Sequence, residues 1–263
     1  MGLFNIFKKK GTPGEKQESK ILLAMPMFNN GEAYKLDDVV NNLKSFWDIT
    51  VTEIEGDNGN AVFKVNGEMI ALAYLPVQIP WGDIEETAKY AYNWENATEA
   101  LKDHNGHAIV SLMAGNKTTV ERFKIFSKVL SAILSTSNAI GIYQGNQTLL
   151  IPKSGYLGHI DELKDDRTAL TLWVYLGLRN SDKGNSLYTY GLTAFGKQEI
   201  EIINSKLSLE ELYEFVANIA TYVIDSDVTL KSGQTLGYTE DQKVKITSSK
   251  GVFVDGESLK LDL

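Results

Sequence analysis

The chain has 263 residues, of which 43% are hydrophobic and 23% are charged, and its formal net charge is −8. These values are typical of a soluble globular protein that is long enough to bury a substantial core in one large domain or two lobes. The absence of cysteine excludes thiol nucleophiles, disulfides and cysteine-ligated metal centres, and it fits a cytoplasmic location.

The charge is distributed unevenly along the chain. Residues 1–20 carry five lysines and two glutamates, a net of +3, which leaves −11 for the remaining residues because the total is −8. An acidic body repels phosphate backbones, and arginine, the usual side chain for phosphate and guanine recognition, supplies only three of the 26 basic residues. We therefore expect no nucleic-acid partner.

Residues 1–20 are predicted to form a flexible basic tail, because the part after Phe7 has the Gly, Pro, Lys and Glu composition of a linker. Leu3, Phe4 and Phe7 precede three consecutive lysines, an arrangement that favours contact with an anionic membrane or with a groove on a partner. The alternative is a tail whose few apolar side chains make no defined contact. Contact with a membrane is expected only through residues 1–10.

Folded chain is expected from residue 21 onward, in two lobes spanning 21–145 and 146–263. Four segments carry apolar residues at the spacing of an amphipathic helix, and they cover residues 37–47, 81–94, 118–137 and 208–224. Asp37 is predicted to be the N-cap of the first of these helices. The third and fourth open with the capping-box pairs Thr118 with Glu121 and Ser208 with Glu211.

Short runs rich in β-branched and aromatic residues lie between these helices, and turn sequences such as EGDNGN and VNGE join several of them. Strands outnumber helices and come in hairpins with single helices inserted. This pattern predicts an α+β fold with two lobes of mixed or antiparallel sheet and helices packed on them. HAIVSLMAG, the helix over 118–137 and AIGIYQ can form one βαβ unit.

The stretch SLYTYGLTAFGKQEIEI, residues 186–202, combines aromatic and hydroxyl side chains with two glycines. Its first ten residues are predicted to form a central strand, with Tyr188 and Tyr190 on one face and Phe195 on the other. Gly191 indicates a bulge or the close approach of another backbone, and EIEII has the alternation of a strand with one wet face. We interpret the three aromatic residues as packed, with a recognition surface as the alternative.

Candidate groups for catalysis or metal binding are few. His104 and His107 lie in KDHNGHAIV, and His159 precedes an acidic run that starts at Asp161, so these four residues are candidates for a metal-dependent enzyme or hydrolase. Alternatively, His107 enters a strand, His104 is solvated, and the acids cover the first turn of a short helix. No ligand set is complete, and neither a phosphate loop nor a nucleophile elbow occurs. We therefore expect no cofactor and favour a protein without enzymatic activity.

Five segments of the chain resemble, in order, the bacterial domain-of-unknown-function family numbered 4261: LWVYLGLR, SLYTYGLTAFGKQEIEI, LEELYEFVANIATYVI, TLKSGQTLGYTEDQKVKI and GVFVDGESLKL. The resemblance covers roughly residues 170–260, with a looser likeness through HAIVSLMAG and LLIPKSGY. It implies no activity or catalytic residue. By analogy with bacterial families of this kind, an immunity- or adaptor-like protein is expected, and an acidic surface suits a basic partner.

Overall fold

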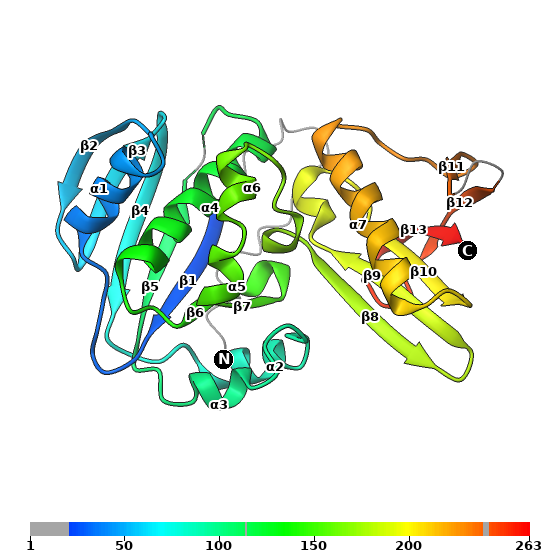
Figure 1. Cartoon of the computed structure of the whole chain (residues 1–263), viewed down its shortest axis with the longest axis horizontal. Helices are drawn as coiled ribbons and strands as arrows, with labels where there is room; N and C mark the ends of the chain where they lie inside the picture. Colours follow the sequence, from blue (N-terminus) through cyan, green and yellow to red (C-terminus); the bar gives the residue numbers. More distant parts are fainter. Residues whose placement is uncertain (1–20, 114, 239–241) are drawn as a thin grey trace. The chain divides into compact units, whose positions relative to one another are not determined.

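The computed structural model describes residues 21–113, 115–238 and 242–263 (Figure 1). The predicted tail at 1–20 lies outside the described residues, and so do its side chains Leu3, Phe4 and Phe7. The chain divides into two compact units, the first reaching Gly145 and including Leu150–Gly158, and the second made of Asn146–Leu149 and His159–Leu263. Each unit contains its own sheet with helices, which confirms the predicted α+β fold with two sheet lobes.

The first unit is built on a seven-stranded sheet with the order β2-β3-β4-β5-β1-β6-β7. Its strands are β1 (Leu22–Phe28), β2 (Val51–Gly56), β3 (Asn60–Val65), β4 (Glu68–Leu75), β5 (Gly106–Leu112), β6 (Gly141–Gln144) and β7 (Leu149–Pro152). Because β1 pairs antiparallel with both β5 and β6, those two strands run parallel to each other. The expected βαβ unit is present, with β1 inserted between its two strands.

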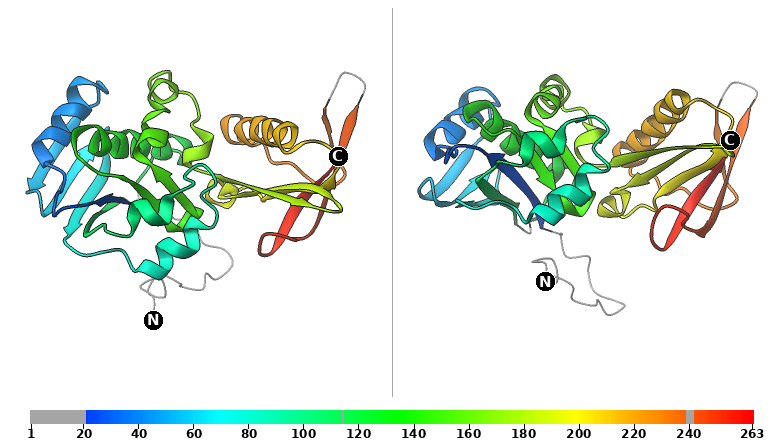
Figure 2. Two further views of the ribbon diagram at one scale, coloured as in Figure 1. Left: turned by 60° about the horizontal axis from the view of Figure 1, so that its bottom comes forward. Right: turned by 90° about the horizontal axis from the view of Figure 1, so that it is seen from below.

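The helices of the first unit are α1 (Leu36–Ser45), α2 (Trp81–Ala88), α3 (Ala97–Leu101), α4 (Thr119–Thr136) and α5 (Lys153–Leu157). A 3-10 turn at Gly145–Gln147 follows β6, where the chain passes from the first unit to the second. Helices α1 and α4 contact each other and lie on one face of the sheet (Figure 2). Helix α4 begins with the predicted capping box, in which the Thr118 hydroxyl accepts from the Glu121 N–H at 3.3 Å and the Glu121 carboxylate accepts from the Thr118 N–H at 2.9 Å.

The predicted N-cap of the first helix is wrong. Helix α1 begins at Leu36 after Lys35, and Asp37 lies in its first turn. The Leu36 N–H donates instead to the Asn58 side-chain oxygen at 2.8 Å. The turn between β2 and β3 thus satisfies a free N–H at the helix start, so no capping side chain is needed there.

The second unit is built on a six-stranded sheet with the order β11-β12-β13-β10-β9-β8. Its strands are β8 (Tyr175–Ser181), β9 (Gly184–Tyr190), β10 (Ile200–Ser205), β11 (Thr235–Gly237), β12 (Lys243–Lys250) and β13 (Glu257–Asp262). Strands β10 and β13 are parallel, and the other pairs are antiparallel. The sheet is therefore mixed, as predicted.

The helices of the second unit are α6 (Ile160–Lys164) and α7 (Leu209–Asp225), with 3-10 turns at Leu170–Leu172 and Leu192–Phe195. Helix α7 packs on β8 and β9, and its predicted capping box between Ser208 and Glu211 is present. Among the described residues of the whole chain, no helix combines the length and the apolar character needed to cross a bilayer.

The predicted strand over 186–195 is shorter than expected. Strand β9 ends at Tyr190, because Gly191 adopts a φ of 127° and a 3-10 turn follows. The expected close approach at Gly191 is confirmed, since a Cβ there would lie 2.9 Å from the carbonyl oxygen of Trp173. A side chain is therefore excluded at this corner both by the backbone angle and by space.

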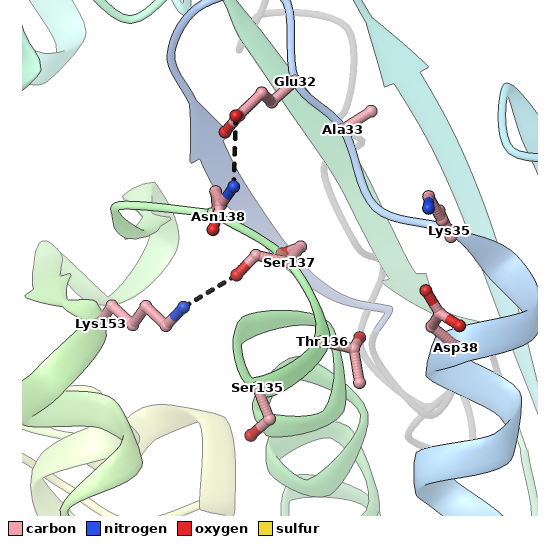
Figure 3. Close-up of a pocket in the computed structure, with 9 residues that line it drawn as sticks. All are labelled: Glu32, Ala33, Lys35, Asp38, Ser135, Thr136, Ser137, Asn138 and Lys153. Atoms are coloured by element: carbon pink, nitrogen blue, oxygen red, sulfur yellow. Dashed lines mark hydrogen bonds between the residues drawn. The ribbon is translucent and has the colours of Figure 1, made fainter.

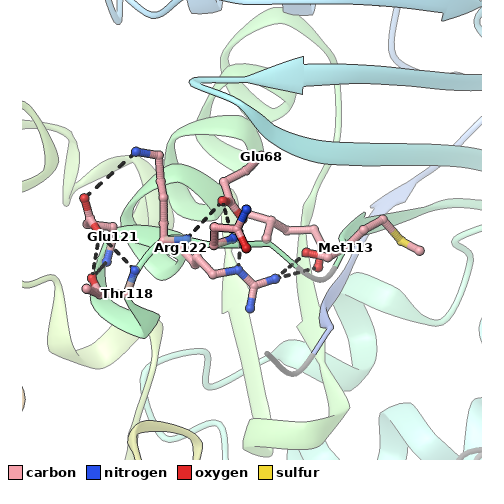
Figure 4. A network of polar contacts seen from close by, with 8 residues as sticks. Glu68, Met113, Thr118, Glu121 and Arg122 are labelled. Atoms are coloured by element: carbon pink, nitrogen blue, oxygen red, sulfur yellow. Dashed lines mark hydrogen bonds and ion pairs between the residues drawn. The ribbon is translucent and has the colours of Figure 1, made fainter. Parts of the chain in front are cut away.

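A buried ion pair fixes the loop between β5 and α4 (Figure 4). Glu68 and Arg122 are almost fully buried, with 3.1 Å between the carboxylate and Nε. The other Glu68 oxygen accepts from the N–H groups of Asn116 and Lys117 at 3.2 Å each, and the Arg122 guanidinium donates to the carbonyl of Met113. The pair therefore connects β4, the loop and α4.

Gly115 is expected to be irreplaceable by alanine, because a Cβ there would lie 1.8 Å from a Glu68 carboxylate oxygen. We predict that Gly115→Ala lowers the stability of the first unit by about 2 kcal/mol by displacing the buried ion pair. Gly82→Ala is the matched control, because no atom lies within 4 Å of the added methyl in α2. It should stabilise α2 by up to about 1 kcal/mol in the same denaturant titration; equal effects of the two changes would contradict the steric argument.

Candidate functional site

The predicted histidine candidates are divided between the two units, with His104 and His107 in the first and His159 in the second. His104 is fully buried, so the expectation that it is solvated is wrong. Its Nε2 accepts from the Ile79 N–H at 2.9 Å, and its Nδ1 donates to the Leu101 carbonyl at 2.6 Å. The two nitrogens thus bind backbone groups of two separate segments, the one between β4 and α2 and the end of α3. This histidine is a structural connector between the segments at 79 and 101.

His107 lies in β5, as expected, and its Nδ1 donates to the Val77 carbonyl at 2.8 Å. Burial lowers the pKa of His107, against the opposing effect of that hydrogen bond. His159 belongs to the second unit, where its Nδ1 lies 2.7 Å from Glu162. Asp161 covers the first turn of α6. No three acidic or histidine side chains of the described segments are grouped so that they could hold a metal ion.

A depression of about 580 Å³ in the first unit is lined mainly by polar and charged residues (Figure 3). It lies beside the end of α4 and is lined by Glu32, Ala33, Lys35, Asp38, Ser135, Thr136, Ser137, Asn138 and Lys153. Glu32 accepts from the Asn138 amide at 3.2 Å, and Lys153 donates to the Ser137 carbonyl at 2.8 Å. Its charges are of mixed sign and partly committed to neighbours, so the lining offers no converging set of reactive groups.

The most unusual polar group of the second unit is Glu201 in β10, whose side chain is completely buried. Strand register places it in one row across the sheet, between Tyr188 of β9 and Lys260 of β13, and Tyr188 in turn faces Gly177 of β8. The expectation that EIEII has one wet face is therefore wrong. The face that holds Glu201 is covered by the loop between β12 and β13.

Four hydrogen-bond donors surround the Glu201 carboxylate. Its carboxylate accepts from the N–H groups of Phe253 at 2.6 Å and Val252 at 3.1 Å, from the Ser258 hydroxyl at 2.5 Å and from the Lys260 ammonium. Burial by itself raises the pKa of this carboxyl, but the Lys260, Ser258 and backbone hydrogen bonds outweigh it and hold the pKa below its usual range. Glu201 is therefore an ionised anchor in the interior of the sheet.

The anchored loop presents apolar side chains to solvent. Its ends are joined by a hydrogen bond of 2.8 Å from the Gly251 N–H to the Gly256 carbonyl. Between them, Val252 is 59% exposed and Phe253 is 38% exposed. The backbone of both residues is held by a buried charge while their side chains remain accessible, which is the arrangement of a preorganised contact loop.

Tyr188 supports this loop from below. Its ring is buried and stacks on Phe253 with 5.2 Å between the centroids, and it meets Tyr175 edge-on at 6.0 Å. Space for the ring exists because β8 has a glycine opposite, where a Cβ at Gly177 would lie 2.1 Å from the Tyr188 ring. Tyr188 thus belongs to the packed support, as interpreted from the sequence, and not to the exposed surface.

Residues 188–262 match the family model of a domain of unknown function, DUF4261. The predicted resemblance is confirmed over this segment. The DUF4261 segment contains Glu201 and all four of its donors, together with Tyr188 and the loop from Gly251 to Gly256. Neither the curated proteins nor the solved structures include a match to this chain.

Tyr190 is the other exposed aromatic side chain next to the anchored loop in the DUF4261 segment. It follows Tyr188 on the same face of β9 and is 40% exposed. Partial burial and the negative charges of Glu199 and Asp255 raise the pKa of its hydroxyl. We call Tyr190, Val252 and Phe253 the exposed patch.

A second buried carboxylate of the DUF4261 segment fixes the corner that follows Tyr190. Glu199 accepts from the Thr189 hydroxyl at 2.7 Å and from the N–H groups of Gly191 and Thr193 at 2.8 and 3.2 Å. Phe195, the third predicted contact residue, is half-buried, 6.0 Å from the Trp173 ring. Of the three aromatic candidates, only Tyr190 therefore projects into the exposed patch.

Sequence reasoning missed Val252, Phe253 and both buried glutamates. A glutamate between isoleucines has the pattern of a surface strand, and its burial depends on Ser258 and Lys260, more than 50 residues away. The available signal was the apolar pair in GVFVDGE, which stands between two glycines where a polar turn is usual. A turn that carries Val and Phe is a candidate for a contact loop.

Proposed function

We propose that the chain is a bacterial cytoplasmic protein without enzymatic activity, which binds another protein through the exposed patch in an immunity- or adaptor-like role. The observation that carries this proposal is the buried Glu201 carboxylate, which fixes the backbone of Val252 and Phe253 while their side chains stay in solvent. Removing a carboxylate from water is expensive, and an apolar side chain at such a position is often equally or more stable. The charge is therefore best explained by the loop that it positions.

The chemistry of the patch fits a protein partner. Aromatic side chains at the centre of an interface supply most of its binding energy, and a loop that is ordered before binding loses less entropy. The patch has two aromatic side chains, Phe253 in the loop and Tyr190 on β9. Asp255 in the loop and Glu257 at the start of β13 are also exposed. This acidic rim favours a partner with a basic surface and would speed its association at low salt.

No observation favours the hydrolase alternative. His104 has both ring nitrogens bonded to the backbone, and the pKa of His107 is lowered by burial. His159 belongs to a different unit from these two residues. We therefore retain one proposed function.

The proposal predicts that Val252→Ser with Phe253→Ser weakens partner binding by about a hundredfold, because two exposed apolar anchors are lost. Tagged full-length chain is recovered from its native cell, the copurifying protein is identified by mass spectrometry, and the purified pair is titrated by calorimetry. Tyr222→Ser is the matched control, since Tyr222 is 51% exposed on α7 and is not part of the exposed patch. Unchanged affinity of the double variant, with the fold intact by circular dichroism, would contradict the proposed site.

A further inference from the structure

The three histidines of the chain differ in what their ring nitrogens contact. Both nitrogens of His104 bind backbone groups, and Nδ1 of His107 donates to a backbone carbonyl. In His159 both nitrogens instead contact side chains of the second unit. Nδ1 lies 2.7 Å from the Glu162 carboxylate, and Nε2 lies 3.1 Å from the Thr171 hydroxyl. The imidazole of His159 therefore connects a carboxylate to a hydroxyl.

The direction of the hydrogen bonds among these three side chains follows from their chemistry. An ionised carboxylate can only accept, so Nδ1 carries the ring hydrogen and donates to Glu162. Nε2 of the neutral ring then has a free lone pair, and the Thr171 hydroxyl donates to it. A hydroxyl within hydrogen-bond distance of a base, which is itself oriented by a third group, is the arrangement of an activated nucleophile.

The contact of the Thr171 hydroxyl differs from that of other hydroxyls in helical segments of this chain. Thr87, Thr136 and Ser137 each donate to the backbone carbonyl four residues earlier, at distances of 2.6–2.9 Å. Such local bonds are the usual arrangement for a hydroxyl in or at the end of a helix. Thr171 lies in the 3-10 turn at Leu170–Leu172, and its hydroxyl contacts a base that is 12 residues away in the sequence.

Buried leucines hold the base and the hydroxyl in place. His159 is the N-cap of α6, and its carbonyl accepts from the Leu163 N–H at 3.0 Å. Leu163 is fully buried, and Leu172, which follows Thr171, is 1% exposed. The His159 side chain itself is 27% exposed, and Thr171 is half-buried. Both groups are therefore fixed in position and partly open to solvent, as proximity-driven chemistry requires.

The charge of this segment limits the kind of reagent that suits the hydroxyl. Residues 159–171 contain four acidic and two basic side chains, a net charge of 2 − 4 = −2 with histidine neutral. They are Asp161, Glu162, Asp165 and Asp166 against Lys164 and Arg167. A negative segment repels phosphorylated and other anionic donors. The reagent that fits is therefore an uncharged electrophile, of which an activated ester is the simplest.

We propose that Thr171 is an acyl-acceptor site that an uncharged activated ester modifies, with His159 as the base and Glu162 as a positioning residue. Oγ1 of Thr171 forms a bond to the acyl carbon while Nε2 of His159 takes the hydroxyl proton. The bond from the acyl carbon to the leaving oxygen then breaks, and the proton passes to that oxygen. The product is the acylated chain, without turnover. This inference does not rest on the proposed function, because these residues lie outside the exposed patch and outside the matched segment 188–262.

The test treats the full-length chain with p-nitrophenyl acetate, quenches with acid and maps acetyl groups by fragmentation mass spectrometry. The tryptic peptide 168–179 lacks lysine and contains both Thr168 and Thr171, which are both half-buried. Thr168 donates to the Asp225 carboxylate without an intervening imidazole, so it is the internal control. Acetylation of Thr171 should be about a hundredfold faster than that of Thr168, because only Thr171 has a general base.

Two variants separate the chemistry from the fold. His159→Ala should reduce acetylation of Thr171 to the rate at Thr168, and added imidazole should restore part of it, which a misfolded chain would not allow. Glu162→Gln should lower the rate by about tenfold or more, and ¹⁵N NMR of the His159 ring should show that its hydrogen is no longer confined to Nδ1. Equal rates at the two threonines, or an unchanged rate at Thr171 in His159→Ala, would overturn the proposal.

Discussion

Replacing Glu201 by glutamine is expected to lower the stability of the second unit by about 3 kcal/mol at pH 7. The neutral amide cannot accept from all four donors, and Lys260, which is only 17% exposed, loses its counter-charge. The first consequence should be local. Amide hydrogen exchange measured by mass spectrometry should accelerate in peptides that contain Val252 and Phe253 before it changes in α7. Glu257 is an exposed carboxylate in the same hairpin. Glu257→Gln should therefore leave both the stability and the exchange rates unchanged.

The contribution of Glu201 to the stability of the second unit should decrease at acidic pH. Because the folded-state pKa of Glu201 lies below its usual value, the unfolded chain binds the proton more readily. Its stabilising contribution is therefore complete above about pH 5 and is lost as the pH falls through the folded-state pKa. The difference between the wild type and Glu201→Gln should shrink correspondingly in denaturant titrations between pH 7 and pH 3. A constant difference over that range would show that the charge is not the stabilising feature.

Breaking the buried ion pair of the first unit should have the largest effect on stability. Either Glu68→Leu or Arg122→Met should lower the free energy of unfolding by about 3–5 kcal/mol. Each single change leaves one uncompensated charge in a site where both side chains are 4% exposed. Glu68→Leu also removes the acceptor for two loop N–H groups. The double variant should recover part of the loss, because no unpaired charge remains. Hydrogen exchange of peptides from β5 and α4 reports the first unit separately from the second.

An exposed ion pair in the same sheet provides the control for the Glu68 and Arg122 variants. Lys64 and Glu53 lie 2.7 Å apart, but their side chains are 32% and 62% exposed. Glu53→Gln should therefore cost less than about 1 kcal/mol, and its effect should vanish at high salt. If Glu53→Gln cost as much as Arg122→Met, burial would not be what makes the Glu68–Arg122 pair important.

Local sequence patterns predicted those features whose partners are close in the chain. The capping boxes at Thr118 and Ser208 need only a glutamate three residues later, and both are formed. The cap at Asp37 failed because its competitor, Asn58, comes from a hairpin 22 residues away. A residue pattern carries no information on a donor or acceptor that tertiary folding supplies.

Contacts between distant segments also explain which residues of the candidate site could be predicted from the sequence and which could not. Tyr190 was identified from its own segment, whereas the exposure of Phe253 follows from how Glu201 of β10 holds the backbone of a loop 52 residues later. His104 was expected in solvent because its flanking residues are polar. Its burial follows from two backbone partners at Ile79 and Leu101, and neither partner has a side-chain signature.

The insertion of β1 between β5 and β6 has a consequence during synthesis. This strand is made first, but its partners Leu112 and Tyr143 are about 90 and 118 residues further along and leave the ribosome roughly 5–20 s later at ordinary elongation rates. During that time the β1 segment, LLAMPMF, has no pairing strand on either side. Because pairing between distant segments is also slow, nascent chains that end before residue 141 should depend on chaperones, whereas chains that extend past β7 should not.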